Sequence, residues 1–240
     1  MKYALLGKTL SHSFSKTFFT EFFSKHAIDA SYENREIKEI AEVKDVFNSH
    51  YNGFNVTIPY KQAIISYLDG VSDEVKKIGA VNTVKLEDGK WIGYNTDAFG
   101  FQQSIKPFLT NLHEKAIILG TGGASKAVAY VLKNIGISCI YISRELSGSD
   151  QFPYEALNEH MLKACKLVVN CTPVGTFPNV EDCVSFPFKY LSSDHLVVDL
   201  IYNPQETKFL HLAKNAGATV LNGESMLKEQ ALKAWEIWNK

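Results

Sequence analysis

The chain has 240 residues, of which 45% are hydrophobic and 21% are charged, and its formal net charge is -1. This balance is typical of a globular protein that buries a sizeable core, in one large domain or two small ones. Lys and Arg are scattered without a basic run, which argues against a nucleic-acid partner.

The cysteine and hydropathy patterns indicate whether the protein binds a metal and in which compartment it is expected. The four cysteines form no CxxC pair and no Cys/His cluster, so we expect no metal site and a reducing compartment. The N-terminal apolar run is too short for a signal peptide, and no stretch approaches the roughly 20 apolar residues of a membrane span. We therefore expect a cytoplasmic protein with no membrane partner.

Strand-like and helix-like segments alternate in the first hundred residues. Residues 3–7 predict a strand, 14–26 a helix, 30–37 a strand and 38–50 a helix. Residues 80–86 and 91–95 predict a hairpin that turns at 87–89. In "GFNVTIPYK" (53–61), alternating apolar residues predict a half-buried strand, and Pro59 predicts the start of a helix. Lys61 would then lie in the first helical turn, where the helix dipole disfavours a cation.

The second half alternates in the same way from residue 114 onward. Strands are predicted at 115–120, 137–143, 166–171, 195–202 and 219–221, and helices at 122–134, from Pro204 to Gly217, and from 225 to the C-terminus. The runs "KLVVNC" and "HLVVDLIY" are apolar throughout, which is typical of parallel strands buried on both faces. The predicted fold is therefore α/β, with two domains that meet near residue 100 and a cleft between them.

A glycine-rich turn, "ILGTGGASKAV", follows a predicted strand and opens a predicted helix. Gly120, Gly122 and Gly123 would permit a tight turn and the close approach of a pyrophosphate to the helix N-terminus. Ser125 stands where the dinucleotide fingerprint has its third glycine, so a plain strand–helix turn is the alternative. The next strand ends at Ser143 and Arg144, and an arginine there favours the 2′-phosphate of NADP over NAD.

Several polar residues have an ordinary structural interpretation as well as a functional one. Ser11, Ser13 and Ser15 surround a helix start, where capping is the simpler interpretation and carboxylate binding the alternative. Thr96 or Asp97 would serve as a helix N-cap. The simplest interpretations of three further residues are a turn or strand edge for Asn82, a core position for Tyr202 and a surface position for Gln230.

Taken in order, eight motifs resemble the shikimate dehydrogenase family from about Ser11 to the C-terminus. They are "SHSFSK", "NVTIPYK", "AVNT", "NTDAFG", "LGTGGASKA", "NCTPVG", "DLIYNPQET" and "NGESMLKEQALKAW". Members of this family reduce 3-dehydroshikimate reversibly to shikimate with NADPH, a step toward chorismate and the aromatic amino acids.

The resemblance implies a role for each matching residue. Lys61 and Asp97 would be the catalytic pair, and Asn55 would lie near the groups that bind the substrate. The substrate would be bound by Ser13, Ser15, Thr57, Lys61, Asn82, Asp97, Tyr202 and Gln230, and NADP(H) by Gly120, Gly122, Gly123, Ala124, Ser143, Arg144, Thr172 and Gly223. The implied domains are a substrate-binding, catalytic domain at 1–100, onto which a C-terminal helix at about 224–240 packs, and an NADP-binding Rossmann domain at 101–223.

The cofactor motifs depart from the family pattern. In "SRELSG", Arg144 is kept, but Glu145 replaces the usual Thr and a second basic residue is missing. Thr176 follows Gly175 where a methionine is common. Ser15, rather than Thr, favours shikimate over quinate by the same resemblance.

Three alternatives remain at this stage. The first is an NAD-preferring quinate/shikimate dehydrogenase, and the second is a non-catalytic dinucleotide-sensing module, for which Lys61 and Asp97 would have no use. The third, a methylene-tetrahydrofolate dehydrogenase-like enzyme, shares the two-domain plan, but the serines do not suit a pterin. The protein is expected to act as a monomer or a homodimer.

Overall fold

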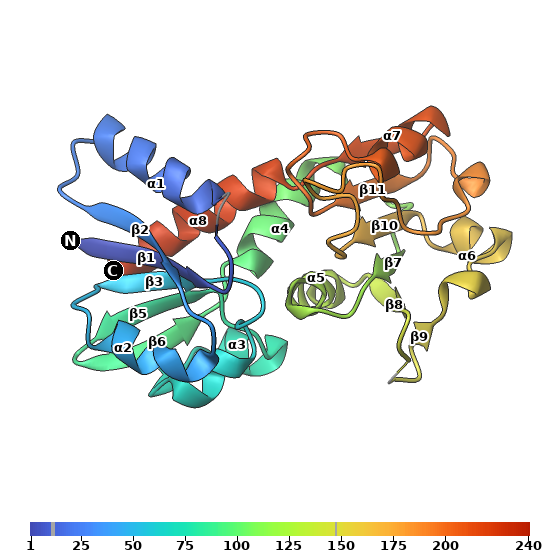
Figure 1. Ribbon diagram of the computed structural model, residues 1–240. Coiled ribbons are helices and arrows are strands. Elements are labelled where there is room, and N and C mark those ends of the chain that lie inside the picture. Colours follow the sequence, from blue (N-terminus) through green and yellow to red (C-terminus); the bar gives the residue numbers. More distant parts are fainter. Residues whose placement is uncertain (11–12, 147) are drawn as a thin grey trace. The chain divides into compact units, whose positions relative to one another are not determined.

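The computed structural model describes residues 1–10, 13–146 and 148–240, so Ser11 lies outside the described residues. The chain divides into two compact units (Figure 1). Unit 1 consists of Met1–Gly100 and Lys228–Lys240, and unit 2 of Phe101–Leu227. Two α/β units agree with the predicted fold class.

Unit 1 is built on a six-stranded sheet with the order β2-β1-β3-β5-β6-β4. β1 pairs in parallel with β2 and β3, whereas β5 is antiparallel to β3 and β6. The strands are β1 (Lys2–Gly7), β2 (Ser31–Glu36), β3 (Gly53–Val56), β4 (Gly70–Val71), β5 (Thr83–Glu87) and β6 (Lys90–Tyr94). The helices that supply residues to this unit are α1 (Phe14–Lys25), η1 (Ile40–Glu42), α2 (Val43–Phe47), η2 (Ala63–Tyr67), α3 (Asp73–Ile78), α4 (Asp97–Ile105) and α8 (Glu224–Trp238).

The alternation of side chains along β1 creates a hydrophobic core on each face of this sheet. Tyr3 and Leu5 pack with Phe19 of α1 and Trp238 of α8. Ala4 and Leu6 belong to the opposite core, to which α2, η2 and α3 also contribute. Figure 1 shows α1 and α8 on one face and α2 and α3 on the other.

Two predictions for unit 1 were wrong in detail. All four residues of β3 are buried, rather than half of them, because helices cover both faces of the sheet. The helix predicted over 38–50 is reduced to η1 and α2, which together cover residues 40–47. The polar residues at both ends of that segment do not continue the apolar stripe that packs a helix against a sheet.

The position predicted for Lys61 was also wrong. Residues 58–62 form a turn, and η2 begins only at Ala63 with Gln62 as its N-cap. Lys61 therefore precedes η2 and its N-cap rather than lying in the first helical turn. Its backbone is held instead by the segment just before β5, because its carbonyl accepts the Val81 N–H at 2.7 Å.

Unit 2 contains a six-stranded sheet in which every adjacent pair is parallel. Its strands are β7 (Lys115–Leu119), β8 (Ser138–Ile142), β9 (Gln151–Phe152), β10 (Leu167–Asn170), β11 (Leu196–Asp199) and β12 (Thr219–Leu221). The intervening helices are η3 (Lys106–Phe108), α5 (Gly123–Asn134), η4 (Tyr154–Ala156), α6 (Glu159–Ala164), η5 (Phe188–Tyr190) and α7 (Lys208–Asn215).

The strand order of this sheet is β12-β11-β10-β7-β8-β9. Counted from the other edge and numbered within unit 2, this is 3-2-1-4-5-6, the order of the Rossmann fold. From β7 the next strands are added toward one edge of the sheet, and from β10 they are added toward the other edge. Ligands of such sheets bind at this switch point, beyond the carboxyl ends of the strands. The fold of unit 2 therefore agrees with the predicted Rossmann type.

One helix of unit 2 begins later than predicted. α7 starts at Lys208 rather than at Pro204, because the Thr207 hydroxyl caps it by accepting the Leu210 N–H at 3.2 Å. Residues 200–206 form an irregular segment that carries Tyr202 and Pro204. Among the described residues, no helix is long and apolar enough to cross a membrane.

Candidate functional site

The centre of the site in unit 1 is an ion pair between Lys61 and Asp97. Lys61 Nζ lies 2.7 Å from Asp97 Oδ2, and the two side chains are 18% and 7% exposed. Lys61 comes from the turn after β3 and Asp97 from the first residue of α4. The pair holds an ammonium, a group that can act in general acid–base catalysis, in a largely buried position.

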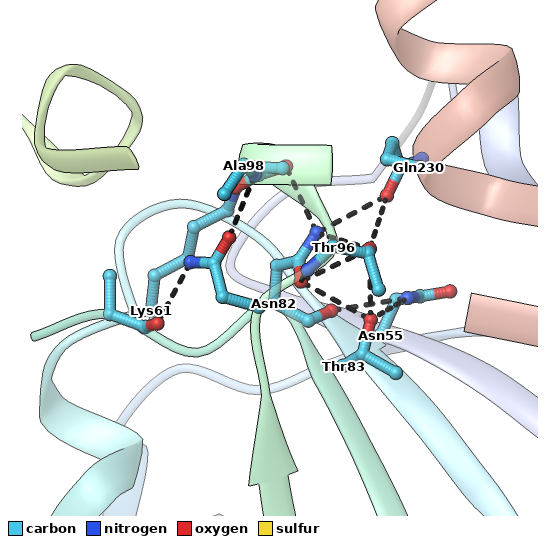
Figure 2. Close-up of polar contacts among 10 residues, drawn as sticks. Asn55, Lys61, Asn82, Thr83, Thr96, Ala98 and Gln230 are labelled. Atoms are coloured by element: carbon cyan, nitrogen blue, oxygen red, sulfur yellow. Dashed lines mark hydrogen bonds and ion pairs between the residues drawn. The ribbon is translucent and has the colours of Figure 1, made fainter. Parts of the chain in front are cut away.

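Asn82 connects this ion pair to the C-terminal helix (Figure 2). Its Nδ2 lies 2.9 Å from Asp97 Oδ1, 3.0 Å from Thr96 Oγ1 and 3.2 Å from Gln230 Oε1. Its Oδ1 accepts the Thr96 N–H at 2.7 Å. Asn82 thus lies at a strand edge, before β5, as expected, whereas the surface interpretation of Gln230 was wrong because this side chain is 7% exposed.

The hydrogen-bond network continues from Asn82 into the sheet. Thr83 Oγ1 lies 3.2 Å from Thr96 Oγ1 and accepts a hydrogen bond from Asn55 Nδ2 at 3.0 Å. The Tyr32 hydroxyl donates to Asn55 Oδ1 at 2.8 Å. Because these groups are buried and satisfied, the network holds the polar side chains in one arrangement.

The start of α4 favours a carboxylate at position 97. The Asn95 carboxamide accepts the Ala98 N–H at 3.1 Å, so Asn95 supplies the cap that was predicted for Thr96 or Asp97. This leaves the Asp97 carboxylate for Lys61 and Asn82. The positive end of the α4 dipole also stabilises the negative charge of Asp97.

The predicted carboxylate-binding serines lie at the start of α1. Ser13 is its N-cap and accepts the Lys16 N–H at 3.2 Å, so the capping interpretation holds for this residue. Ser15 lies in the first turn, and a hydrogen bond connects its side chain with that of Tyr32. Thr57 is half-buried after β3 and lies against Gly7 at the end of β1: a Cβ on Gly7 would be 2.7 Å from Thr57 Cγ2.

Thr83 and Thr96 are members of the site that the sequence interpretation missed. Both are fully buried and hydrogen-bonded to the residues around Asp97. The available signal was the pair of adjacent polar residues in "AVNTV" and "YNTDAFG", within otherwise apolar surroundings. A buried polar side chain needs a partner, so such positions predict a network.

Unit 2 provides a glycine-lined turn at its switch point. Gly120 adopts φ +96°, and a Cβ there would lie 3.0 Å from Thr172 Cγ2, beyond the end of β10. Gly122 is the N-cap of α5, with no side-chain cap, and a Cβ on it would meet nothing within 4 Å. Gly123 and Ala124 form the first turn of α5. An open N-terminus at the end of a parallel strand suits a phosphate group.

The residues after β8 are those predicted to favour NADP over NAD at the cofactor's ribose. Ser143 is buried, its N–H donates to the Phe152 carbonyl at 3.0 Å, and its hydroxyl accepts the Glu145 N–H at 3.3 Å. Arg144 and Glu145 are exposed, and no ion pair connects them in the part of the chain that the structure describes. The positive charge of Arg144 lowers the pKa of Tyr154, although burial raises that pKa more strongly.

Gly223 and Tyr202 lie beyond β12 and β11. A Cβ on Gly223 would be 2.1 Å from the Leu200 carbonyl oxygen, so only glycine fits this position. The Gly223 N–H donates to the Ile201 carbonyl at 3.0 Å, which joins the two segments. Tyr202 is half-buried in the segment after β11. Among the described residues, no group of three His, Cys, Asp or Glu could hold a metal ion.

Residues 5–84 match the family model of the shikimate dehydrogenase substrate binding domain. A curated relative from Clostridium beijerinckii, named shikimate dehydrogenase (NADP(+)), is 38% identical over 99% of this chain and 92% of its own length. The chain belongs to the shikimate dehydrogenase family. The resemblance inferred from eight motifs is therefore confirmed, and it extends across both units.

Two solved structures of shikimate dehydrogenases are similar along the whole chain. The enzyme from Thermus thermophilus, in complex with NADP(H) and shikimate, is 31% identical with a TM-score of 0.86, over 99% of this chain and 93% of that one. The enzyme from Listeria monocytogenes, in complex with shikimate and NAD, is 28% identical with a TM-score of 0.87, over 99% and 91%. Shikimate dehydrogenases have thus been solved with either dinucleotide.

Proposed function

We propose that this chain catalyses the reversible reduction of 3-dehydroshikimate to shikimate with NADPH. The observation that carries this proposal is the ion pair of Lys61 and Asp97, held by Asn82 within a buried polar network in unit 1. A sensor module would need no such pair. Curated relatives named for this NADP-dependent activity support the proposal.

The chemistry at Lys61 follows from its charge and its partner. Bound NADPH supplies the hydride. As the ketone is reduced, negative charge develops on its oxygen, and the Lys61 ammonium stabilises that charge and donates a proton. Asp97 orients the amine through the 2.7 Å contact. In the reverse direction, neutral Lys61 accepts the hydroxyl proton of shikimate.

The substrate is held by hydroxyl and amide groups. Ser13 and Ser15, at the N-terminus of α1, bind the carboxylate, because the helix dipole favours an anion there. Thr57, Asn82 and Gln230 bind ring hydroxyls, and Tyr202 completes the substrate contacts. We further propose that residues 1–100 with the C-terminal helix bind substrate, and that residues 101–223 bind the dinucleotide.

The residues of unit 2 fit a dinucleotide. The open N-terminus of α5 at Gly122, Gly123 and Ala124 would receive the pyrophosphate, and Gly120 and Thr172 line the same turn. Arg144 is exposed where a 2′-phosphate would be bound, with Ser143 beside it. Gly223 would contribute to dinucleotide binding as well.

The experiment that tests this function is an absorbance assay of NADPH oxidation with 3-dehydroshikimate, run beside an identical NADH assay. We expect fast turnover with NADPH. Folded protein that binds dinucleotide but turns over neither cofactor would contradict the enzyme and favour the sensor.

A second candidate is a shikimate dehydrogenase that uses NAD as readily as NADP. Glu145 favours it, because it is an acid that could bind the ribose hydroxyls and it occupies the place of the usual Thr. Comparable turnover with NADH and NADPH would support this candidate. Turnover of quinate with NAD would add quinate to its substrates. A cytoplasmic location and a monomer or homodimer remain predictions.

A further inference from the structure

A buried carboxylate in unit 2 has no role in the function proposed so far. Asp199 is the last residue of β11 and is fully buried. Its Oδ1 accepts the Asn170 Nδ2–H at 3.0 Å and the Ile201 N–H at 3.1 Å, and its Oδ2 accepts the Thr207 hydroxyl at 2.7 Å. All these donors are neutral, and no lysine or arginine of the described chain forms an ion pair with it.

Asn170 connects Asp199 by hydrogen bonds to Thr172, beside the glycine-lined turn. It is the last residue of β10 and is fully buried. Its Oδ1 accepts both the Thr172 hydroxyl at 2.7 Å and the Thr172 N–H at 3.1 Å. Because Asp199 takes the Nδ2–H, the carboxamide can only turn its oxygen toward Thr172. Thr172 in turn lies against Gly120 at the switch point.

Burial of a charge costs free energy, which argues that this carboxylate has a specific use. Desolvation raises the pKa of Asp199 to about 6, so the group is mainly ionised at neutral pH. An ionised carboxylate is purely an acceptor, which fixes the direction of every hydrogen bond in the chain Asp199–Asn170–Thr172.

We propose that Asp199 is a positioning residue for the dinucleotide. Acting through Asn170, it holds Thr172 and the loop after β10 against Gly120, in the conformation that receives the cofactor. This inference rests on the proposed dinucleotide binding of unit 2. Asp199 would contact neither the ligand nor the reacting atoms. Its substitution should therefore change the affinity for the cofactor without changing the KM for the substrate.

The test measures the Kd of NADP+ by calorimetry, the KM for 3-dehydroshikimate and the thermal midpoint of Asp199→Ala and Asp199→Asn. We expect Asp199→Ala to raise the Kd of NADP+ about 10-fold or more, since a buried amide loses its acceptor, with the KM for 3-dehydroshikimate nearly unchanged. Asp199→Asn should retain most of the affinity, because its Oδ1 still accepts from Asn170 and the Thr207 hydroxyl can accept from its Nδ2.

Two control variants separate positioning from stability. Thr207→Val removes the bond to Oδ2 and the cap of α7 but leaves the path through Oδ1 intact, so it should lower the thermal midpoint without weakening NADP+ binding. Asp194→Ala removes an exposed acid at the opposite end of β11 and should change neither quantity.

The outcomes distinguish this inference from the proposed function. Wild-type affinity for NADP+ in folded Asp199→Ala would overturn the inference, as would a loss of affinity in Thr207→Val proportional to its loss of stability. If Asp199→Ala does not fold, Asn170→Ser breaks the same path at its middle and carries the same expectation. Wild-type protein that binds no dinucleotide would overturn the proposed function, and this inference with it.

Discussion

Asn82 donates an Nδ2–H to Asp97 Oδ1 at 2.9 Å, the carboxylate oxygen that is not the partner of Lys61. The two carboxylate oxygens therefore have different partners, Asn82 on one and Lys61 on the other. The carboxylate cannot rotate without breaking both contacts. Asn82 thus fixes the plane of Asp97, and Asp97 fixes the position of the Lys61 ammonium.

Lys61→Ala tests the proton donor. The variant should lower kcat roughly 10³-fold or more, because it removes both the acid and the charge that stabilises the developing alkoxide. The KM for 3-dehydroshikimate should change little. The matched control is Lys85→Ala, another partly buried lysine of unit 1, which pairs with Glu87 at 3.2 Å. Near-normal turnover in Lys61→Ala would contradict the role.

Asp97→Asn tests the orientation of the amine. The substituted side chain has the same shape, but it is neutral and can turn an NH₂ group toward the Lys61 ammonium. We expect kcat to fall about 10²-fold, and the thermal midpoint to fall as well, because the largely buried Lys61 ammonium loses its counter-charge. Steady-state kinetics and a melting curve measure both quantities. Asp73→Asn, in the exposed pair with Lys76, should behave as wild type, and equal activity of the two variants would rule out a catalytic Asp97.

Gly122→Ala and Gly223→Ala should have different consequences. An added Cβ at Gly122 meets no atom within 4 Å and its φ is −73°, so alanine should leave the thermal midpoint unchanged or slightly raised. It should nevertheless weaken NADP+ binding about 10-fold by filling the pyrophosphate position. At Gly223 the Cβ would overlap the Leu200 carbonyl, and such overpacking costs about 1–3 kcal/mol or more.

Melting curves and titrations with NADP+ separate the two glycine variants. Gly122→Ala that keeps wild-type affinity would argue against the pyrophosphate site. Gly223→Ala that keeps the wild-type midpoint would show that the contact with Leu200 relaxes.

Arg144→Ala tests the dinucleotide preference. If Arg144 binds the 2′-phosphate, its removal costs a charge-assisted hydrogen bond, and kcat/KM for NADPH should fall about 10-fold or more. The value for NADH should hardly change, since NADH lacks that phosphate. Lys133→Ala, which removes an exposed cation near the end of α5, is the control. An equal loss with both cofactors would assign Arg144 to another role.

The pH dependence of stability should reveal the buried Asp199. Its pKa is about 6 in the folded protein against an ordinary 3.8, so the folded state binds more protons between these values. The stability contributed by this group is therefore present at low pH and is lost as the pH rises through about 6. Relative to Asp199→Asn, wild type should lose about 2 kcal/mol of unfolding free energy between pH 4.5 and 7.5.

Urea unfolding of both proteins at the two pH values provides this comparison. Burial lowers the pKa of His113 and His195, and these groups act in the opposite sense as the pH falls. They are present in both proteins, so their effect cancels in the difference. A difference that does not vary with pH would show that Asp199 keeps an ordinary pKa.

Local sequence patterns determined most of unit 2. Continuous apolar runs at β10 and β11 and the glycines between β7 and α5 specify a parallel sheet and its first turn, because these features depend on neighbouring residues in the chain. The motif order also determined the family. The hydroxyl cap at Ser13 was predictable for the same local reason.

The tertiary structure alone decided which polar residues meet. Asn82 and Gln230 are far apart in the chain, and no local pattern brings them together. Lys61 lies in a turn before η2, and its carbonyl accepts the N–H of Val81, which is distant in the chain and lies just before β5. Asp199 is indistinguishable in sequence from a polar strand end, and its partners come from two other segments. Periodicity reports which face of an element is buried, whereas hydrogen bonds between elements depend on how the chain packs in three dimensions.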